Sequence, residues 1–190
     1  MKQLSMGIKI LIGVGAAVLL IVLWFIGAYN GFVRADVAIS GQWAQVETQY
    51  QRRFDLIPNL VNSVKGIMNQ EKEVFGKLAD ARSKYAGAGT INEKATAAGE
   101  VETALSRLLV VMENYPELRS TETVTNLMAS LEGTENRVAV ERKRYNDIIQ
   151  SYNQKLRVFP GALVGKMFGF SAKTYFESTE GAQNAPTVDL

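Results

Sequence analysis

The chain has 190 residues and a formal net charge of +2, from 21 basic and 19 acidic side chains. It contains no histidine and no cysteine, which excludes disulfide bridges, thiol nucleophiles, imidazole bases and the common zinc sites. The nearly balanced charge gives no basic field that would favour nucleic acid over other partners. We therefore expect no catalytic residue, no metal or other cofactor, no nucleic acid and no small-molecule substrate.

An uncharged segment extends from Ile10 to Val33. As a helix, its 24 residues would be roughly 36 Å long, enough to cross about 30 Å of hydrocarbon. Trp24 and Tyr29 near one end suit an interfacial aromatic belt. We predict a transmembrane helix over residues 10–33. A cleaved signal peptide is the alternative, although the apolar core of such a peptide normally has only about 7–15 residues.

The basic residues around this segment predict its orientation. Lys2 and Lys9 precede it, whereas Arg34 is the only basic residue between the segment and Arg52. The positive-inside rule then puts residues 1–9 in the cytoplasm and the body on the other side of the membrane. Small residues four apart within the segment could let two such helices pack closely. They are Gly13 with Ala17 and Gly27 with Gly31.

Apolar residues recur at steps of three and four after the span, which predicts a helix over about residues 35–85. They are Trp43, Val46, Tyr50, Ile57, Leu60, Val64, Ile67, Val74, Leu78, Ala81 and Tyr85. Pro58 removes one backbone hydrogen bond inside this helix, so we expect a kink at residues 54–58. The bend would keep the stripe facing its partners, or it would present the freed carbonyls to another protein.

Two further helices are expected. Thr90 and Glu93 fit a capping box that starts a helix over about residues 91–114, and Pro116 follows its end. A helix over about residues 120–158 carries an apolar residue at every seventh position, as in a bundle or a coiled-coil seam. Those residues are Val124, Leu131, Val138, Tyr145 and Tyr152, joined by Met128, Ile149 and Leu156.

Short connections between long helices favour antiparallel packing. The expected fold class is all-α, with the transmembrane helix followed by an antiparallel bundle over residues 34–158 that resembles a four-helix bundle. The next segment, residues 159–176, is aromatic and could pack on its own bundle, insert at the membrane surface or dock on a neighbouring subunit. Residues 177–190 have no apolar period and are expected to be disordered.

Some charged residues fall on the apolar stripes of the long helices. They are Arg53, Glu71, Glu135 and Arg142. A buried charge needs a partner, and Arg53 and Glu71 are too far apart along one helix to serve each other. We therefore predict that Arg53 meets a carboxylate of the third helix and that Glu71 meets one of its arginines, which would fix the register of the helices.

A predicted interaction surface has two parts. The first lies on the outer face of the first long helix, and the second lies in the aromatic tail. The residues are Arg52, Asp55 and Asn59 in the first part, and Phe159, Pro160, Phe168, Phe170 and Phe176 in the second.

Four blocks of sequence resemble the LemA family, in the order and at the spacing of that family. They are RRFDLIPNLVNSVKG (52–66), ENYPELRS (113–120), LEGTENRVAVERKRYNDIIQSYN (131–153) and FPGALVGKMFGF (159–170). Gly165 stands where the tail motif of the family has alanine. The resemblance implies a bacterial, membrane-anchored helical bundle with no known catalytic activity. It also implies an association with membrane-protein quality control, alongside a membrane metalloprotease.

Two hypotheses for the function remain. The first is a single-pass structural or scaffold protein of the bacterial inner membrane, with its body in the periplasm. It would form a homo-oligomer through its helical seams and aromatic tail and would organise or shape membrane lipids. The second is an adaptor or sensor that acts with a membrane protease. An enzyme ranks last, because histidine and cysteine are absent.

Overall fold

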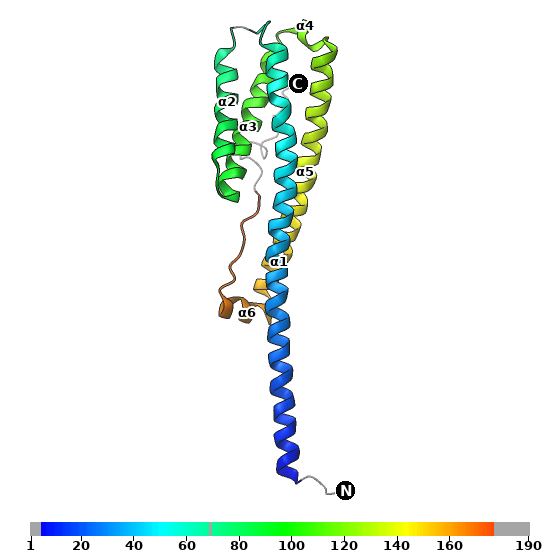
Figure 1. The fold of residues 1–190 in the computed structure, drawn as a ribbon, viewed down its shortest axis with the longest axis vertical. Helices are drawn as coiled ribbons and strands as arrows, with labels where there is room; N and C mark the ends of the chain where they lie inside the picture. The colour runs from blue at the N-terminus through cyan, green and yellow to red at the C-terminus, as the bar shows by residue number, and fades with distance from the viewer. Residues whose placement is uncertain (1–4, 69, 177–190) are drawn as a thin grey trace, which may run out of the picture. The chain divides into compact units, whose positions relative to one another are not determined.

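The computed structural model describes residues 5–68 and 70–176. In these two ranges the chain forms six helices and no strand (Figure 1). The helices are α1 (Met6–Val64), α2 (Lys72–Gly87), α3 (Ile91–Met112), α4 (Pro116–Arg119), α5 (Glu122–Arg157) and α6 (Gly161–Phe168). The prediction of an all-α fold is confirmed. The disorder predicted for residues 177–190 concerns residues outside the described part.

The chain divides into two compact units. The first consists of Met1–Gly41 and Asn146–Tyr175, and the second of Gln42–Tyr145 and Phe176–Leu190. Helices α1 and α5 each contribute residues to both units.

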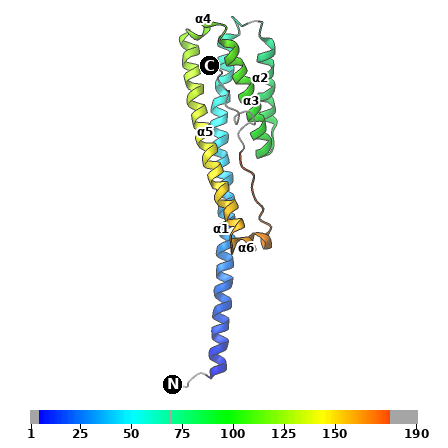
Figure 2. The ribbon, with the colours of Figure 1, turned by 180° about the vertical axis from the view of Figure 1, so that it is seen from behind.

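The second unit is an antiparallel bundle of four helices. Its part of α1, then α2, α3 and its part of α5 lie side by side and alternate in direction, while the short α4 connects α3 to α5 (Figure 1, Figure 2). Apolar residues at helical spacing form its core, because only one face of each helix can be covered by its neighbours. Tyr50, Leu60, Leu78, Leu108 and Leu131 are at most 3% exposed.

The prediction of one helix over residues 35–85 is wrong in its second half. Helix α1 ends at Val64, and α2 begins at Lys72 and runs back beside α1 (Figure 1). Turn bonds follow α1, with the amides of Ile67 and Met68 donating to the carbonyl of Val64. Gly66 weakens a continuing helix, and burial of Met68, which is 0% exposed, favours the turn. Periodicity could not reveal this break, because apolar residues keep helical spacing on both sides of it.

Pro58 does not end α1. The helix continues for more than a full turn beyond it, to Val64. The kink that we expect over residues 54–58 stays a prediction. At its N-terminal end, by contrast, the helix is longer than the predicted range of residues 35–85, because α1 runs without interruption from Met6.

The start of α3 is confirmed as a capping box. The Glu93 amide donates to the Thr90 hydroxyl at 3.2 Å, and the Glu93 carboxylate accepts from the Thr90 amide at 3.0 Å. These bonds hold the pKa of Glu93 below its usual value. Because they satisfy amides that a helix start leaves without partners, they fix the turn between α2 and α3.

In the first unit, α6 packs against α1 and α5. Val164 is 0% exposed. Gly169, with a φ of 73°, ends α6 in the left-handed region, where glycine has no steric penalty. The chain then continues as an extended segment to Phe176.

Two glycines of α6 lie at close approaches to α5. A Cβ atom at Gly161 would lie 2.1 Å from the backbone carbonyl oxygen of Lys155, and one at Gly165 would lie 2.4 Å from Cδ2 of Leu156. A backbone oxygen cannot move aside alone, whereas the end of a leucine side chain can rotate. The lack of a Cβ atom at Gly165 thus allows α6 to lie close to Leu156.

This difference predicts unequal effects of two matched substitutions. We expect Gly161→Ala to destabilise the docking of α6 by about 1–3 kcal/mol, as overpacking does, and Gly165→Ala to cost less. Hydrogen exchange of the amides in residues 161–170, measured on the full chain in detergent, reports this local stability. Equal exchange rates in the two variants would contradict the close approach at Gly161.

Candidate functional site

The apolar part of α1 is exposed along its length. Ile10, Trp24, Tyr29 and Val33 are 61%, 43%, 39% and 37% exposed. The most apolar window of α1 has a mean hydropathy of 2.8, and none of it is buried within the chain. By length and composition this helix could cross a membrane. An apolar surface of this size normally has a partner other than water, which indicates a membrane-associated protein.

An aromatic cluster joins the tail to α1 in the first unit. We define it as Tyr29, Phe32, Phe168 and Phe170. The Phe32 and Phe170 rings stack with centroids 5.0 Å apart, and the Tyr29 ring lies 4.9 Å from that of Phe168 and 5.7 Å from that of Phe170. Phe32 is only 4% exposed. The part of the tail up to Phe170 therefore packs on its own chain, one of the three possibilities that the sequence left open.

The extended segment after α6 is held by Asn153. Its amide nitrogen donates to the Lys173 carbonyl, and its amide oxygen accepts from the Lys173 backbone N–H, both at 2.8 Å. The Lys173 ammonium forms an ion pair with Asp36 at 2.7 Å. Because Asn153 satisfies both backbone groups of one residue, it fixes the extended conformation of the segment as well as its position.

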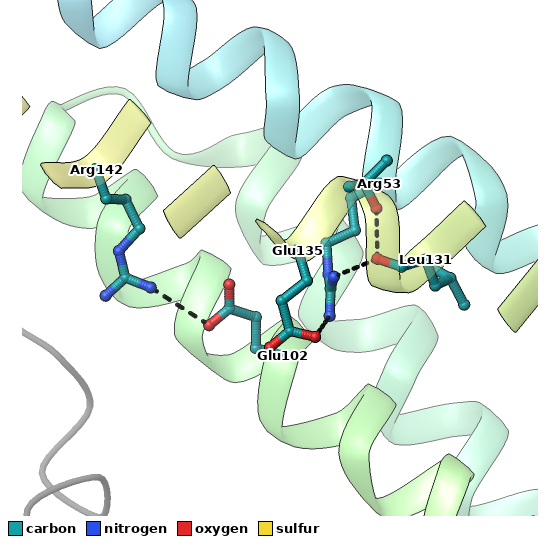
Figure 3. A network of polar contacts seen from close by, with 6 residues as sticks. Arg53, Glu102, Leu131, Glu135 and Arg142 are labelled. Carbon is teal, nitrogen blue, oxygen red and sulfur yellow. Dashed lines mark hydrogen bonds and ion pairs between the residues drawn. The ribbon is translucent and has the colours of Figure 1, made fainter. Parts of the chain in front are cut away.

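A network of charges lies inside the bundle of the second unit (Figure 3). Arg53 of α1 is 5% exposed. Its Nη1 donates to the Leu131 carbonyl at 2.9 Å, and its Nη2 donates to Glu135 at 3.2 Å. The contact that we expect between Arg53 and a carboxylate of the third predicted helix is present. It crosses from α1 to α5.

Arg142 makes two contacts from α5. Its guanidinium lies 3.8 Å from the Glu102 carboxylate of α3 (Figure 3), and its Cζ lies 4.0 Å from the centroid of the Phe176 ring. That ring also stacks on Trp43 and Tyr50, with centroids 6.2 Å and 6.5 Å away. Phe176 is thus half-buried and packs against core residues of the second unit. Burial raises the pKa of Glu102, although the positive charges of Arg142 and Arg53 oppose this shift.

Two of the four predicted inner charges lie elsewhere. Glu71 occupies the N-cap position of α2, in the connection after α1, but its side chain makes no capping hydrogen bond, and no ion pair of Glu71 is present among the described residues. Its predicted pairing with an arginine is wrong because the helix breaks before it. The Glu135 side chain is 68% exposed, because it lies beside the buried stripe of Leu131 and Val138 and not on it. Glu135 reaches Arg53 from the edge of the bundle.

Of the other predicted surface residues, all but the half-buried Pro160 are exposed, and no contact of theirs identifies a partner. Arg52, Asp55 and Asn59 all lie on the exposed face of α1, where Asp55 accepts a hydrogen bond from Gln51. Phe159 is 83% exposed, and its peptide bond to Pro160 is cis. Their role in binding stays a prediction.

Sequence reasoning missed Glu102, Asn153 and Asp36. Asn153 carried a usable signal, because it is four residues after the buried Ile149 and next to the seam residue Tyr152, so it lies on the inner side of α5. The partner of Glu102 comes from α5 and that of Asp36 from the extended segment after α6, so both are far away in the sequence and left no local pattern. In the described ranges, no group of three or more acidic, histidine or cysteine side chains could hold a metal ion.

The geometry of Arg53 predicts that its hydrogen bond to the Leu131 carbonyl contributes more to the stability of the fold than its ion pair with Glu135. We expect Arg53→Glu to lower the free energy of unfolding by roughly 3–5 kcal/mol, because it buries an unpaired carboxylate beside the Leu131 oxygen. Glu135→Gln should cost less than about 1 kcal/mol, since an exposed ion pair contributes little. Chemical unfolding of the full chain in detergent measures both. Equal losses would show that the ion pair dominates.

The raised pKa of Glu102 predicts a pH effect. Burial in the folded chain disfavours the charged form of Glu102. Its protonated form therefore contributes stability below the ordinary pKa of a glutamate, about 4.3. This contribution is lost as pH rises through the pKa of Glu102 in the folded chain. Glu102→Gln keeps the shape without the charge. Its free energy of unfolding, relative to the native chain, should rise as pH increases from about 4 to neutral.

Unfolding at a series of pH values measures this difference. Glu100→Gln on the same helix is the matched control, because Glu100 pairs with Lys84 at an exposed position. A variant at position 102 that becomes less stable than the native chain at neutral pH would show that pairing with Arg142 outweighs burial.

Comparison with known proteins agrees with the sequence blocks. The model of the LemA family matches residues 42–190. Magnetosome protein MamQ 2 of Paramagnetospirillum magneticum is 28% identical over 175 residues, covering 78% of this chain and 64% of the relative. Protein LemA of Metamycoplasma hominis is 21% identical over 160 residues, covering 82% of this chain and 72% of the relative. The chain thus spans less than two thirds of the magnetosome relative. The resemblance is confirmed, and the chain belongs to the LemA family.

Proposed function

We propose that the chain is a non-enzymatic structural protein that is anchored in a membrane by α1 and assembles with copies of itself. The observation that carries the proposal is the continuity of α1. The same helix has an exposed apolar surface in its first part and a buried face, with Tyr50 and Leu60, in its second. The helix that would enter the membrane therefore also supplies core residues to the bundle of the second unit.

Self-assembly is supported by the small residues of the span. At Gly13, Gly27 and Gly31, apart from adjacent residues and the backbone of α1 itself, no atom of the described residues lies within 4 Å of the position that a Cβ would occupy. Gly27 and Gly31 are four apart, so they share one face of α1. In lipid, helices associate where small residues let their backbones approach closely. A second copy of α1 is the partner that this face would fit.

The relatives are compatible with a structural role. Neither the name Magnetosome protein MamQ nor the name Protein LemA describes a reaction. Location in the bacterial inner membrane with the body in the periplasm is part of the proposal, and it rests on the basic residues before the span. An adaptor that acts with a membrane metalloprotease is the competing function.

The mass of the protein in mild detergent and in nanodiscs distinguishes the two functions. A structural protein should form a large assembly of defined mass by itself, whereas an adaptor should stay small until its protease is added. The double variant Gly27→Ile and Gly31→Ile should shift the assembly toward smaller species, while Leu19→Ile, a matched change in the same span, should not. A monodisperse monomer in native-like lipid would contradict the proposal.

A further inference from the structure

We propose that α6 is a second membrane contact, an interfacial helix that lies on a bilayer surface rich in anionic phospholipids. The inference rests on the proposed function, because it requires the apolar part of α1 to be in lipid. The inference adds a membrane-binding surface on α6, which the membrane span alone does not provide.

The first argument is the level at which α6 is attached. The aromatic cluster ties Phe168 and Phe170 to Tyr29 of α1. Tyr29 is four residues before Val33, the last residue of the uncharged segment, which is about 6 Å along a helix. When the span is inserted, the attachment point of α6 therefore lies about one helical turn from the edge of the hydrocarbon.

The second argument is the direction of α6. Within the first unit, it runs crosswise to α1 (Figure 1, Figure 2). Membrane-spanning helices are tilted only moderately from the bilayer normal, on average by about 20°. A helix that lies crosswise to such a span is close to parallel with the membrane surface, which is the orientation of an interfacial helix.

The third argument is the apolar surface that α6 leaves uncovered. Leu163 and Met167 are 46% and 62% exposed, and they share one face because they are four residues apart. Phe168 adds a ring that is 49% exposed, and Phe159, just before α6, is 83% exposed. These exposed side chains give α6 an apolar face that the described residues of the chain leave uncovered.

The fourth argument is charge. In residues 34–41 and 146–175, which follow the span within the first unit, there are five basic and two acidic side chains. The basic residues are Arg34, Lys155, Arg157, Lys166 and Lys173, and the acidic residues are Asp36 and Asp147. Arg34 and Lys155, together with Asp147, also line an open groove of about 650 Å³ between α1 and α5. Such an excess of positive charge beside a span attracts anionic headgroups.

The same charge argues against a second copy of the chain as the occupant of this surface. Two equivalent surfaces, each with an excess of three positive charges, would repel one another if they met face to face. A bilayer surface with negative headgroups complements both the charge and the apolar side chains of α6.

Site-directed labels test the proposal on the full chain, which has no native cysteine. Single variants Leu20→Cys, Met167→Cys and Val110→Cys each carry a nitroxide label in the span, on α6 and on α3, and all three positions are exposed. The protein is reconstituted into vesicles of phosphatidylethanolamine and phosphatidylglycerol in equal parts. Collision with dissolved oxygen and with an aqueous nickel chelate then reports the depth of each label.

We expect the label at position 167 to lie about 5–10 Å inside the headgroup and acyl boundary, as interfacial helices do. Its nickel collision rate should fall several-fold relative to position 110, which should remain in water. A label at position 167 that is as accessible to nickel as position 110, while position 20 is in lipid, would overturn the inference and leave the anchor intact. A label at position 20 in water would instead contradict the proposed function itself.

Two further outcomes test whether anionic lipid covers the exposed surface of α6. Broadening of the spectrum at position 167 that disappears on dilution with unlabelled protein would show that a second copy covers this surface, and it would overturn the inference. In vesicles of phosphatidylcholine alone, the label at position 167 should move toward water. An unchanged depth there would overturn the assignment to anionic headgroups.

Discussion

The structure depends on the continuity of α1. Met6–Val64 is one helix, and its surface changes character along its length, from apolar and exposed to amphipathic with a buried face. A helix satisfies its own backbone hydrogen bonds, so it can pass from hydrocarbon to water without leaving polar groups unpaired. The aromatic cluster and the contact between Arg53 and Leu131 are both built on this helix, one in each unit.

The interior charges of the second unit do not follow the simple idea of paired buried ions. Arg53 is buried but donates to a backbone carbonyl as well as to Glu135, whose side chain is largely exposed. Glu102 and Arg142 face one another at 3.8 Å, too far for a strong hydrogen bond. Contacts of this kind specify how helices align more than they stabilise them.

Much of the fold could be predicted from the sequence because it depends on patterns among residues that are close together in the sequence. The uncharged segment after Ile10, the heptads of α5 and the capping box at Thr90 each depend on residues a few positions apart, and each is present in the structure. The break after Val64 was missed because the turn there preserves the spacing of apolar residues. Its cause is tertiary, since α2 is stabilised by packing against α3.

The candidate site was less predictable for the same reason. The aromatic residues of the tail were recognisable by composition, but their contacts with Tyr29 and Phe32 join positions that are distant in the sequence. The two hydrogen bonds between Asn153 and Lys173 depend on a segment without any periodic pattern. Sequence patterns indicate which residues are available, whereas the fold decides which of them meet.

The central claim is that α1 leaves the bilayer as an uninterrupted helix. The most direct measurement is the distance between spin labels at positions 12 and 37 of the full chain in lipid vesicles, since both residues are exposed and belong to the first unit. Continuity predicts a narrow distribution near 37 Å, about 1.5 Å for each residue of separation. A broad distribution or a clearly shorter distance would show a hinge at the membrane surface and would contradict the claim.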